Sequence, residues 1–264
     1  MIAALARGAL ADPSDVSATA PFHMPGMTPE RAASLELMLG HMSSIPSGLT
    51  LVGAELGGEF PITRRLSLEA VLPVAYESGG GRSGLALGNV TAGAGYTLRA
   101  PGHGIGWAVG GSVSFPTAPD TGDGRAAAFD HSVFRVPFPG HYQPRTTTLR
   151  LRADARIDDE MLFLQLHLAS HMLVVDGAGD VFLMVLGASG GVRLTERTAM
   201  ITEVTIVSDI LDDSSGDNFL HTLDLGFRHR ERSTVFGLRL YLPLSDSLRS
   251  RSMVGVALDV AQRF

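Results

Sequence analysis

Histidine and serine, which can act as a base and a nucleophile, are adjacent at His131 and Ser132. Covalent catalysis needs a nucleophile, a base and an orienting group that converge in space, and no known hydrolase spacing accompanies this pair. The sequence also lacks the G-x-S-x-G, H-E-x-x-H and phosphate-loop motifs. His167 and His171 would lie about 13 Å apart along a strand, too far to share a metal ion. We therefore expect no catalytic residue, no enzyme activity and no cofactor.

A short histidine and methionine cluster near the N-terminus could bind a soft metal. His23, Met24 and Met27 offer imidazole and thioether ligands suited to copper, and His41 and Met42 follow further on. Alternatively, these residues belong to a flexible periplasmic arm or plug that contains methionine without binding a metal. We expect no metal site, and His23, Met24 and Met27 are the candidates to check. The absence of cysteine excludes disulfides and thiolate sites.

Alternation of apolar and polar residues is the dominant signal in the sequence. At positions 148–157, leucine, alanine and isoleucine alternate with threonine, arginine and aspartate, and at positions 66–76 the even positions are all apolar. A face as charged as that of 149–157 cannot be buried unpaired in a soluble sandwich. A period of two predicts strands with one lipid-facing and one inward-facing side.

The alternation divides the chain into twelve strands, an even number typical of closed outer-membrane barrels. The expected strands are 33–42, 49–60, 66–76, 85–99, 106–115, 146–157, 161–174, 181–193, 198–209, 219–230, 234–242 and 252–264. The first could instead begin as a short amphipathic helix, because Pro29 and Glu30 suit a helix N-terminus. The expected fold is an all-β, antiparallel, up-and-down transmembrane β-barrel of about twelve strands.

The connections and the aromatic residues agree with this fold. Short connections at 61–65, 100–105, 158–160, 194–197 and 231–233 alternate with longer ones at 77–84, 116–145, 175–180, 210–218 and 243–251. Short periplasmic turns and longer external loops produce this pattern when both termini are periplasmic. Aromatic residues fall near expected strand ends, as two interfacial girdles require: Trp107, Phe236, Phe227 and Tyr96 at one side, and Phe115, Phe182, Phe219 and Tyr76 at the other. The connection 116–145 is the candidate to fold inward as a constriction.

Charged residues on the inward faces define the candidate functional site. The expected channel-lining residues are Arg150, Arg152, Arg156, Arg228, Arg239, Glu55, Glu69, Glu203, Asp224 and Asp259. In a channel, the row of Arg150, Arg152 and Arg156 would favour anionic solutes. Alternatively, the opposite charges pair across the interior and fill it. Both interpretations remain open at this stage.

The two ends of the chain carry processing and insertion patterns. Residues 1–11 have the small-x-small form of a secretory cleavage site at Ala9-Leu10-Ala11, although a disordered tail would also explain them. We expect a truncated signal peptide at 1–11, a periplasmic arm at 12–32 and the barrel at 33–264. Val256, Leu258, Val260 and the terminal Phe264 share one face of the last strand. This looks like the signal that the barrel-assembly machinery recognises for membrane insertion.

Composition limits the partners. The chain has 264 residues and a formal net charge of −6, so we expect no nucleic-acid partner. No apolar run reaches the length of about 18 residues that a membrane helix needs. The expected partners are outer-membrane lipid, lipopolysaccharide and a small-molecule solute.

Three short motifs carry a resemblance to a known family. They are Phe60-Pro-Ile-Thr63, Leu72-Pro73 and Leu87-Gly-Asn-Val90, with Asn89 where an aspartate is more usual. They resemble the outer-membrane transporter family named for the MetA pathway of phenol degradation. The resemblance covers the first third of the chain and the last strand, and it implies passage of small apolar or aromatic molecules.

The sequence thus predicts a passive outer-membrane channel for small molecules, aromatic or anionic. A closed structural or ligand-binding barrel without transport is the alternative, and an outer-membrane lipid hydrolase is the third. A soluble all-β domain is the remaining alternative for the fold.

Overall fold

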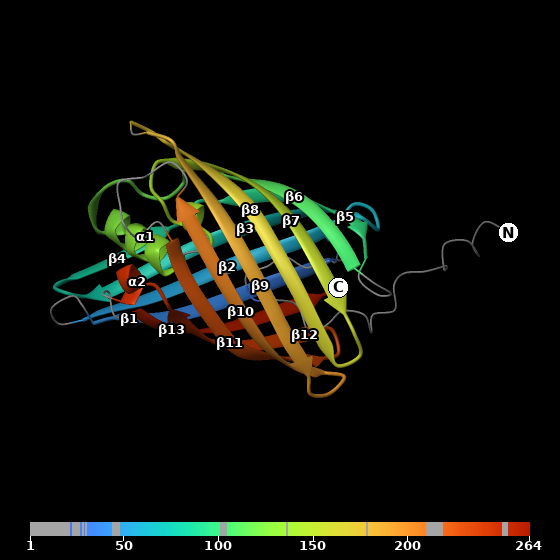
Figure 1. Ribbon diagram of the computed structural model, residues 1–264. Coiled ribbons are helices and arrows are strands. Elements are labelled where there is room, and N and C mark those ends of the chain that lie inside the picture. The colour runs from blue at the N-terminus through green and yellow to red at the C-terminus, as the bar shows by residue number, and fades with distance from the viewer. Residues whose placement is uncertain are drawn as a thin grey trace.

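The computed structural model describes residues 22, 27, 29, 31–43, 48–100, 105–135, 137–177, 179–209, 219–249 and 253–264. They form a closed antiparallel barrel whose wall has twelve strand positions (Figure 1). The strands are β1 (Ala32–Met42), β2 (Leu49–Pro61), β3 (Leu66–Gly79), β4 (Arg82–Leu87), β5 (Thr91–Arg99), β6 (Ile105–Ser114), β7 (Thr146–Asp158), β8 (Leu162–Val175), β9 (Val181–Arg193), β10 (Thr198–Asp209), β11 (Phe219–Glu231), β12 (Thr234–Pro243) and β13 (Met253–Arg263). The helices are α1 (Gly122–Phe134), the 3-10 helix η2 (Pro139–His141) and α2 (Asp246–Arg249).

Closure of the barrel depends on β1, which pairs with β2 on one side and with β13 on the other. Leu37, for example, is opposite Ala54 of β2 and Leu258 of β13. The segment 33–42 is therefore a strand and not the helix that its flanking Pro29 would also allow. Among the other expected strands, the segment 85–99 is the one that the structure divides into two strands.

The prediction of one continuous strand at 85–99 was wrong. Two shorter strands, β4 and β5, occupy this segment, and both pair with β3. The interruption at 88–90 contains Asn89, whose fully buried side chain bonds to the connection between β6 and β7. The outward-facing positions change parity across this break, from Leu85 and Leu87 in β4 to Tyr96 and Leu98 in β5, and the prediction of one strand overlooked that change.

The outer surface of the barrel is apolar, as alternation requires. Leu149 and Leu151 of β7 are exposed, whereas Asp154 and Arg156 of the same strand are buried. Seven of the eight expected girdle aromatics are exposed and Phe182 is half-buried. An exposed belt of this extent is stable in hydrocarbon, not in water. No helix in the described part of the chain is long and apolar enough to cross a membrane.

The two ends of the barrel differ in the length of their connections. We call the end that carries the short turns, the start of β1 and the end of β13 the turn rim, and the opposite end the loop rim. Helices α1 and α2 lie at the loop rim, and the C-terminus lies at the other end of the barrel (Figure 1). At the turn rim, the Phe264 amide donates a hydrogen bond to the Arg31 carbonyl at 3.0 Å.

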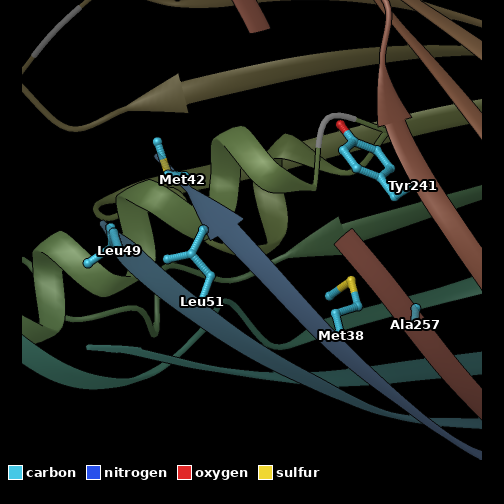
Figure 2. Close-up of a cluster of buried hydrophobic side chains, with 6 residues drawn as sticks. All are labelled: Met38, Met42, Leu49, Leu51, Tyr241 and Ala257. Atoms are coloured by element: carbon cyan, nitrogen blue, oxygen red, sulfur yellow. The ribbon is translucent and has the colours of Figure 1, made fainter. Parts of the chain in front are cut away.

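Apolar side chains also cover part of the inner surface near the loop rim. Figure 2 shows one such cluster, formed by Met38, Met42, Leu49, Leu51, Tyr241 and Ala257. The connection between β6 and β7 closes over it: the Cα of Gly53 in β2 is so near α1 that an added Cβ would lie 3.2 Å from His131 Cδ2. On the opposite wall, Leu248 of α2 packs on Ala169, Val185 and Val207. Leu248 thus holds α2 inside the loop rim, and Ala127 and Ala128 hold α1 through a separate cluster with Ala75 and Ala86.

Candidate functional site

All ten charged residues that the sequence places on the inward faces are buried or half-buried in the structure. Their neighbours along each strand are mostly exposed on the outer surface. The inner surface of the barrel therefore gathers five arginines and five carboxylates. Their role as a channel lining remains a prediction.

Ion pairs neutralise most of these arginines. The pairs with the nitrogen–oxygen distances are Arg152–Glu69 at 3.3 Å, Arg156–Asp158 at 2.6 Å, Arg228–Asp259 at 3.1 Å, and Arg239 with Asp224 at 3.4 Å and with Glu36 at 2.5 Å. In the row on β7, Arg152 and Arg156 are paired with carboxylates, as the alternative of paired charges expected. Pairing follows from the cost of burying an uncompensated charge.

Glycines on the intervening strands let these pairs lie flat against the wall. Arg152 is opposite Gly110, which in turn is opposite Gly95. A Cβ added to Gly95 would lie 2.9 Å from Arg152 Nη2, and one added to Gly110 would lie 2.5 Å from Arg152 Nε. Arg152 therefore crosses two strands along the inner surface of the wall to reach Glu69.

The connection between β6 and β7 folds into the lumen and carries a sixth arginine. Arg135 follows α1, and its guanidinium lies 2.8 Å from Glu36 of β1 and 2.7 Å from Glu55 of β2. His141 Nδ1 donates to Glu55 Oε1 at 3.2 Å. Burial opposes the charge of Arg135, but the two glutamates outweigh burial and raise its pKa. The inward folding expected for 116–145 is thus present, and a five-residue polar network that includes Arg239 fastens it to the wall.

Asn89 forms a second attachment for this connection. Its side-chain amide donates to the carbonyls of Gly140 and Gln143, both at 2.8 Å, and its Oδ1 accepts from the Ala118 amide at 2.9 Å. Its backbone amide donates to the His141 carbonyl at 2.6 Å. An aspartate could accept from Ala118 but could not donate to the carbonyls. The amide at this position is therefore suited to the connection that it holds.

Two described residues of the expected N-terminal arm lie inside the barrel. The Phe22 amide donates to Glu203 Oε2 at 2.9 Å, and the Phe22 ring lies 5.0 Å from Arg228 Cζ and 5.5 Å from Arg239 Cζ. Nearer the turn rim, the Met27 carbonyl accepts from Thr97 Oγ1 at 2.7 Å. Phe22 also packs with three inward apolar residues, Phe163, Ala199 and Ile201. The ring therefore occupies lumen space between the two rims.

A cavity of about 260 Å³ lies in the lumen beside Phe22 and the inward-folded connection. Its lining includes both phenylalanines, Phe22 and Phe138, together with charged side chains of both signs: Glu36, Glu55, Glu69, Arg135, Arg150 and Arg152. The cavity is thus lined by polar side chains of the barrel wall. The N-terminal segment and the connection between β6 and β7 add the aromatic rings of Phe22 and Phe138. A small amphipathic molecule would find both kinds of contact there.

The residues that could serve in catalysis or metal binding either form hydrogen bonds within their own helix, are buried, or lie outside the described residues. His131 Nδ1 donates to the Ala127 carbonyl at 2.9 Å and Ser132 Oγ donates to the Phe129 carbonyl at 2.7 Å, so both are engaged with their own helix. His23 and Met24 lie outside the described residues, and Met27 is buried. Within the ranges that the structure describes, no group of three or more His, Cys, Asp or Glu residues could hold a metal ion.

Comparisons with known structures agree with the fold. An outer membrane channel from Pseudomonas putida F1 superposes with a TM-score of 0.63 at 12% identity, covering 89% of this chain and 96% of that one. The NanC porin gives 0.56 at 7% identity over 87% and 100% of the two chains, and the KdgM porin gives 0.53 at 8% over 88% and 99%. No family model and no curated protein matches the sequence. The chain is therefore a bacterial outer-membrane β-barrel by its fold and its lipid-facing belt, while membership of the MetA-pathway family stays a prediction.

Several residues of the site could not be picked out from the sequence. Glu36 lies between Leu35 and Leu37, so its inward parity was visible, but nothing marked its contact with Arg135. Arg135, Phe138 and Phe22 belong to segments without periodicity, where no pattern predicts position. For these segments, proline and glycine content was the only available signal of inward folding.

Proposed function

We propose that this protein is a passive channel that lets small molecules, aromatic or anionic, cross the outer membrane. The observation that carries the proposal is the cavity of about 260 Å³ in the lumen of a closed, lipid-facing barrel. Its wall offers paired charges of both signs, and such a polar interior suits solute passage down a gradient. The turn rim would face the periplasm, where short turns of such barrels lie.

Two inserted elements would limit passage to small solutes. Phe22 narrows the lumen from within, and the connection between β6 and β7 covers the loop rim through Arg135 and Asn89. A barrel permanently filled by these elements would instead be a structural or ligand-binding protein without transport. The extensive ion pairing of the lumen favours this second candidate, so the test must separate the two.

Liposome swelling with the purified full-length chain provides that test. The protein is refolded in detergent, and its folding is confirmed by heat-dependent gel mobility before reconstitution. We expect swelling rates above those of empty liposomes with one-ring solutes and lower rates as solute size increases. Swelling that equals empty liposomes for every solute would refute transport and leave the closed barrel as the function.

A further inference from the structure

Arg150 differs from the other inward arginines in its partners. Among the described residues, its guanidinium makes no ion pair with a carboxylate. Its Nη2 donates to His167 Nε2 at 3.0 Å, and His167 in turn donates from Nδ1 to Asp154 at 2.7 Å. This arrangement uses His167 as a neutral acceptor, so it leaves the positive charge of Arg150 uncompensated by direct contact.

The surroundings of Arg150 have the features of a ligand-binding site. Its Cζ lies 4.7 Å from the centroid of the Phe138 ring, and both side chains line the lumen cavity. Its Nε is buried without a hydrogen-bond partner in the described part of the chain. A buried donor without a partner costs free energy until a ligand or water satisfies it.

We propose that Arg150 binds the carboxylate of a small organic acid whose body is a single aromatic ring. A guanidinium can hold a carboxylate through two parallel N–H···O bonds, and a bond to a charged group is stronger than one to a neutral group. The volume of about 260 Å³ is below the roughly 300–1,000 Å³ of pockets for drug-sized ligands. Phe22 and Phe138 supply apolar contacts for a ring of that size. This inference rests on the proposed function, because the acid would bind during its passage.

The neighbouring carboxylates do not disqualify an anion. Glu55 is held by Arg135 and His141, Glu36 by Arg135 and Arg239, and Glu69 by Arg152. Each of these acids is paired, so among the described residues that line the cavity, Arg150 is the cation without a carboxylate partner. A positively charged solute would be repelled by the Arg150 guanidinium, because no carboxylate of the described residues contacts that guanidinium.

Calorimetric titration of the full-length protein in detergent tests the site, with benzoate, acetate and benzyl alcohol as probes. We expect benzoate to bind more tightly than either of the others, because acetate lacks the ring and benzyl alcohol lacks the charge. In Arg150→Gln, benzoate affinity should fall about tenfold or more, the loss expected when a charged hydrogen-bonding partner is removed. Arg150→Lys, which keeps the charge but not the two-pronged geometry, should fall between wild type and Arg150→Gln.

Arg193→Gln is the matched control, because it removes the same charge at the end of β9 from a residue that is paired with Asp158 and lies outside the cavity lining. Its benzoate affinity should equal that of wild type, and heat-dependent gel mobility establishes that each variant is folded. Equal benzoate binding by wild type and Arg150→Gln, or equal binding of benzoate and benzyl alcohol, would overturn the proposal.

Liposome swelling on the same preparations separates this proposal from the proposed function. Swelling with neutral solutes but no Arg150-dependent benzoate binding would overturn the site and leave the channel intact. Benzoate binding without any swelling would overturn the channel and, with it, the assignment of Arg150 to a transported acid.

Discussion

Replacing Asn89 by aspartate should release the connection between β6 and β7 from the wall. The substitution keeps the shape of the side chain but removes the two donors that reach the carbonyls of Gly140 and Gln143. It also directs a negative charge at both oxygens. Each hydrogen bond contributes about 0.5–1.5 kcal/mol net, and each buried group left unsatisfied costs about 1–3 kcal/mol. The two carbonyls left without a donor should therefore cost the docked connection about 2–6 kcal/mol, a change of about thirtyfold or more in its docking equilibrium.

Limited trypsin digestion of the folded barrel measures this change, since Arg125 and Arg135 lie within the connection. We expect cleavage in the variant under conditions where wild type resists, while the rest of the barrel stays folded by heat-dependent gel mobility. Gln262→Glu makes the same amide-to-acid change at the turn rim, where Gln262 donates to Ser233, and it should leave the connection protected. Equal protection of wild type and Asn89→Asp would refute the role assigned to Asn89.

Three further predictions concern the lumen. Phe22→Ala should raise single-channel conductance in a planar bilayer, because it removes a ring from the lumen; unchanged conductance would mean that the ring does not limit flow. Gly95→Ala should displace Arg152 from Glu69, since the new Cβ would lie 2.9 Å from Arg152 Nη2, and the freed cation should shift the reversal potential toward anion selectivity. Burial lowers the pKa of His131 below its ordinary 6.5. The released connection therefore binds more protons than the docked one between that lowered pKa and 6.5, so docking should weaken as the pH falls through this range, by at most about 1.4 kcal/mol per pH unit. Trypsin protection should therefore fall more steeply with decreasing pH in wild type than in His131→Gln, and equal slopes would refute this assignment.

Much of the wall could be predicted from the sequence, because each wall strand obeys one local rule. Burial alternates along residues 201–207 of β10, and both β9 and β10 have the bounds that the pattern predicts. A lipid-facing surface forces this regularity, since every second side chain must be apolar. The break between β4 and β5 was missed although the outward-facing positions change from odd to even across it, and the contact that fixes the break involves residues about 50 positions later in the chain.

The lumen could be predicted only in part. Strand parity places Arg150 and Arg152 on the inward side correctly, but parity says nothing about pairing. Arg152 forms an ion pair with Glu69 across two glycine-bearing strands. Arg150 instead forms a hydrogen bond with His167 and a cation–π contact with Phe138. Such differences depend on which strands are neighbours and which side chains reach across them, so they require the structure.

The central claim is that the lumen conducts and that its inserted elements limit the flow. Single-channel recording in a planar lipid bilayer tests it most directly, with folded wild type compared with Phe22→Ala and Asn89→Asp. We predict small discrete current steps for wild type and larger ones for both variants. A folded wild-type barrel that is silent, and that stays silent in both variants, would contradict the claim.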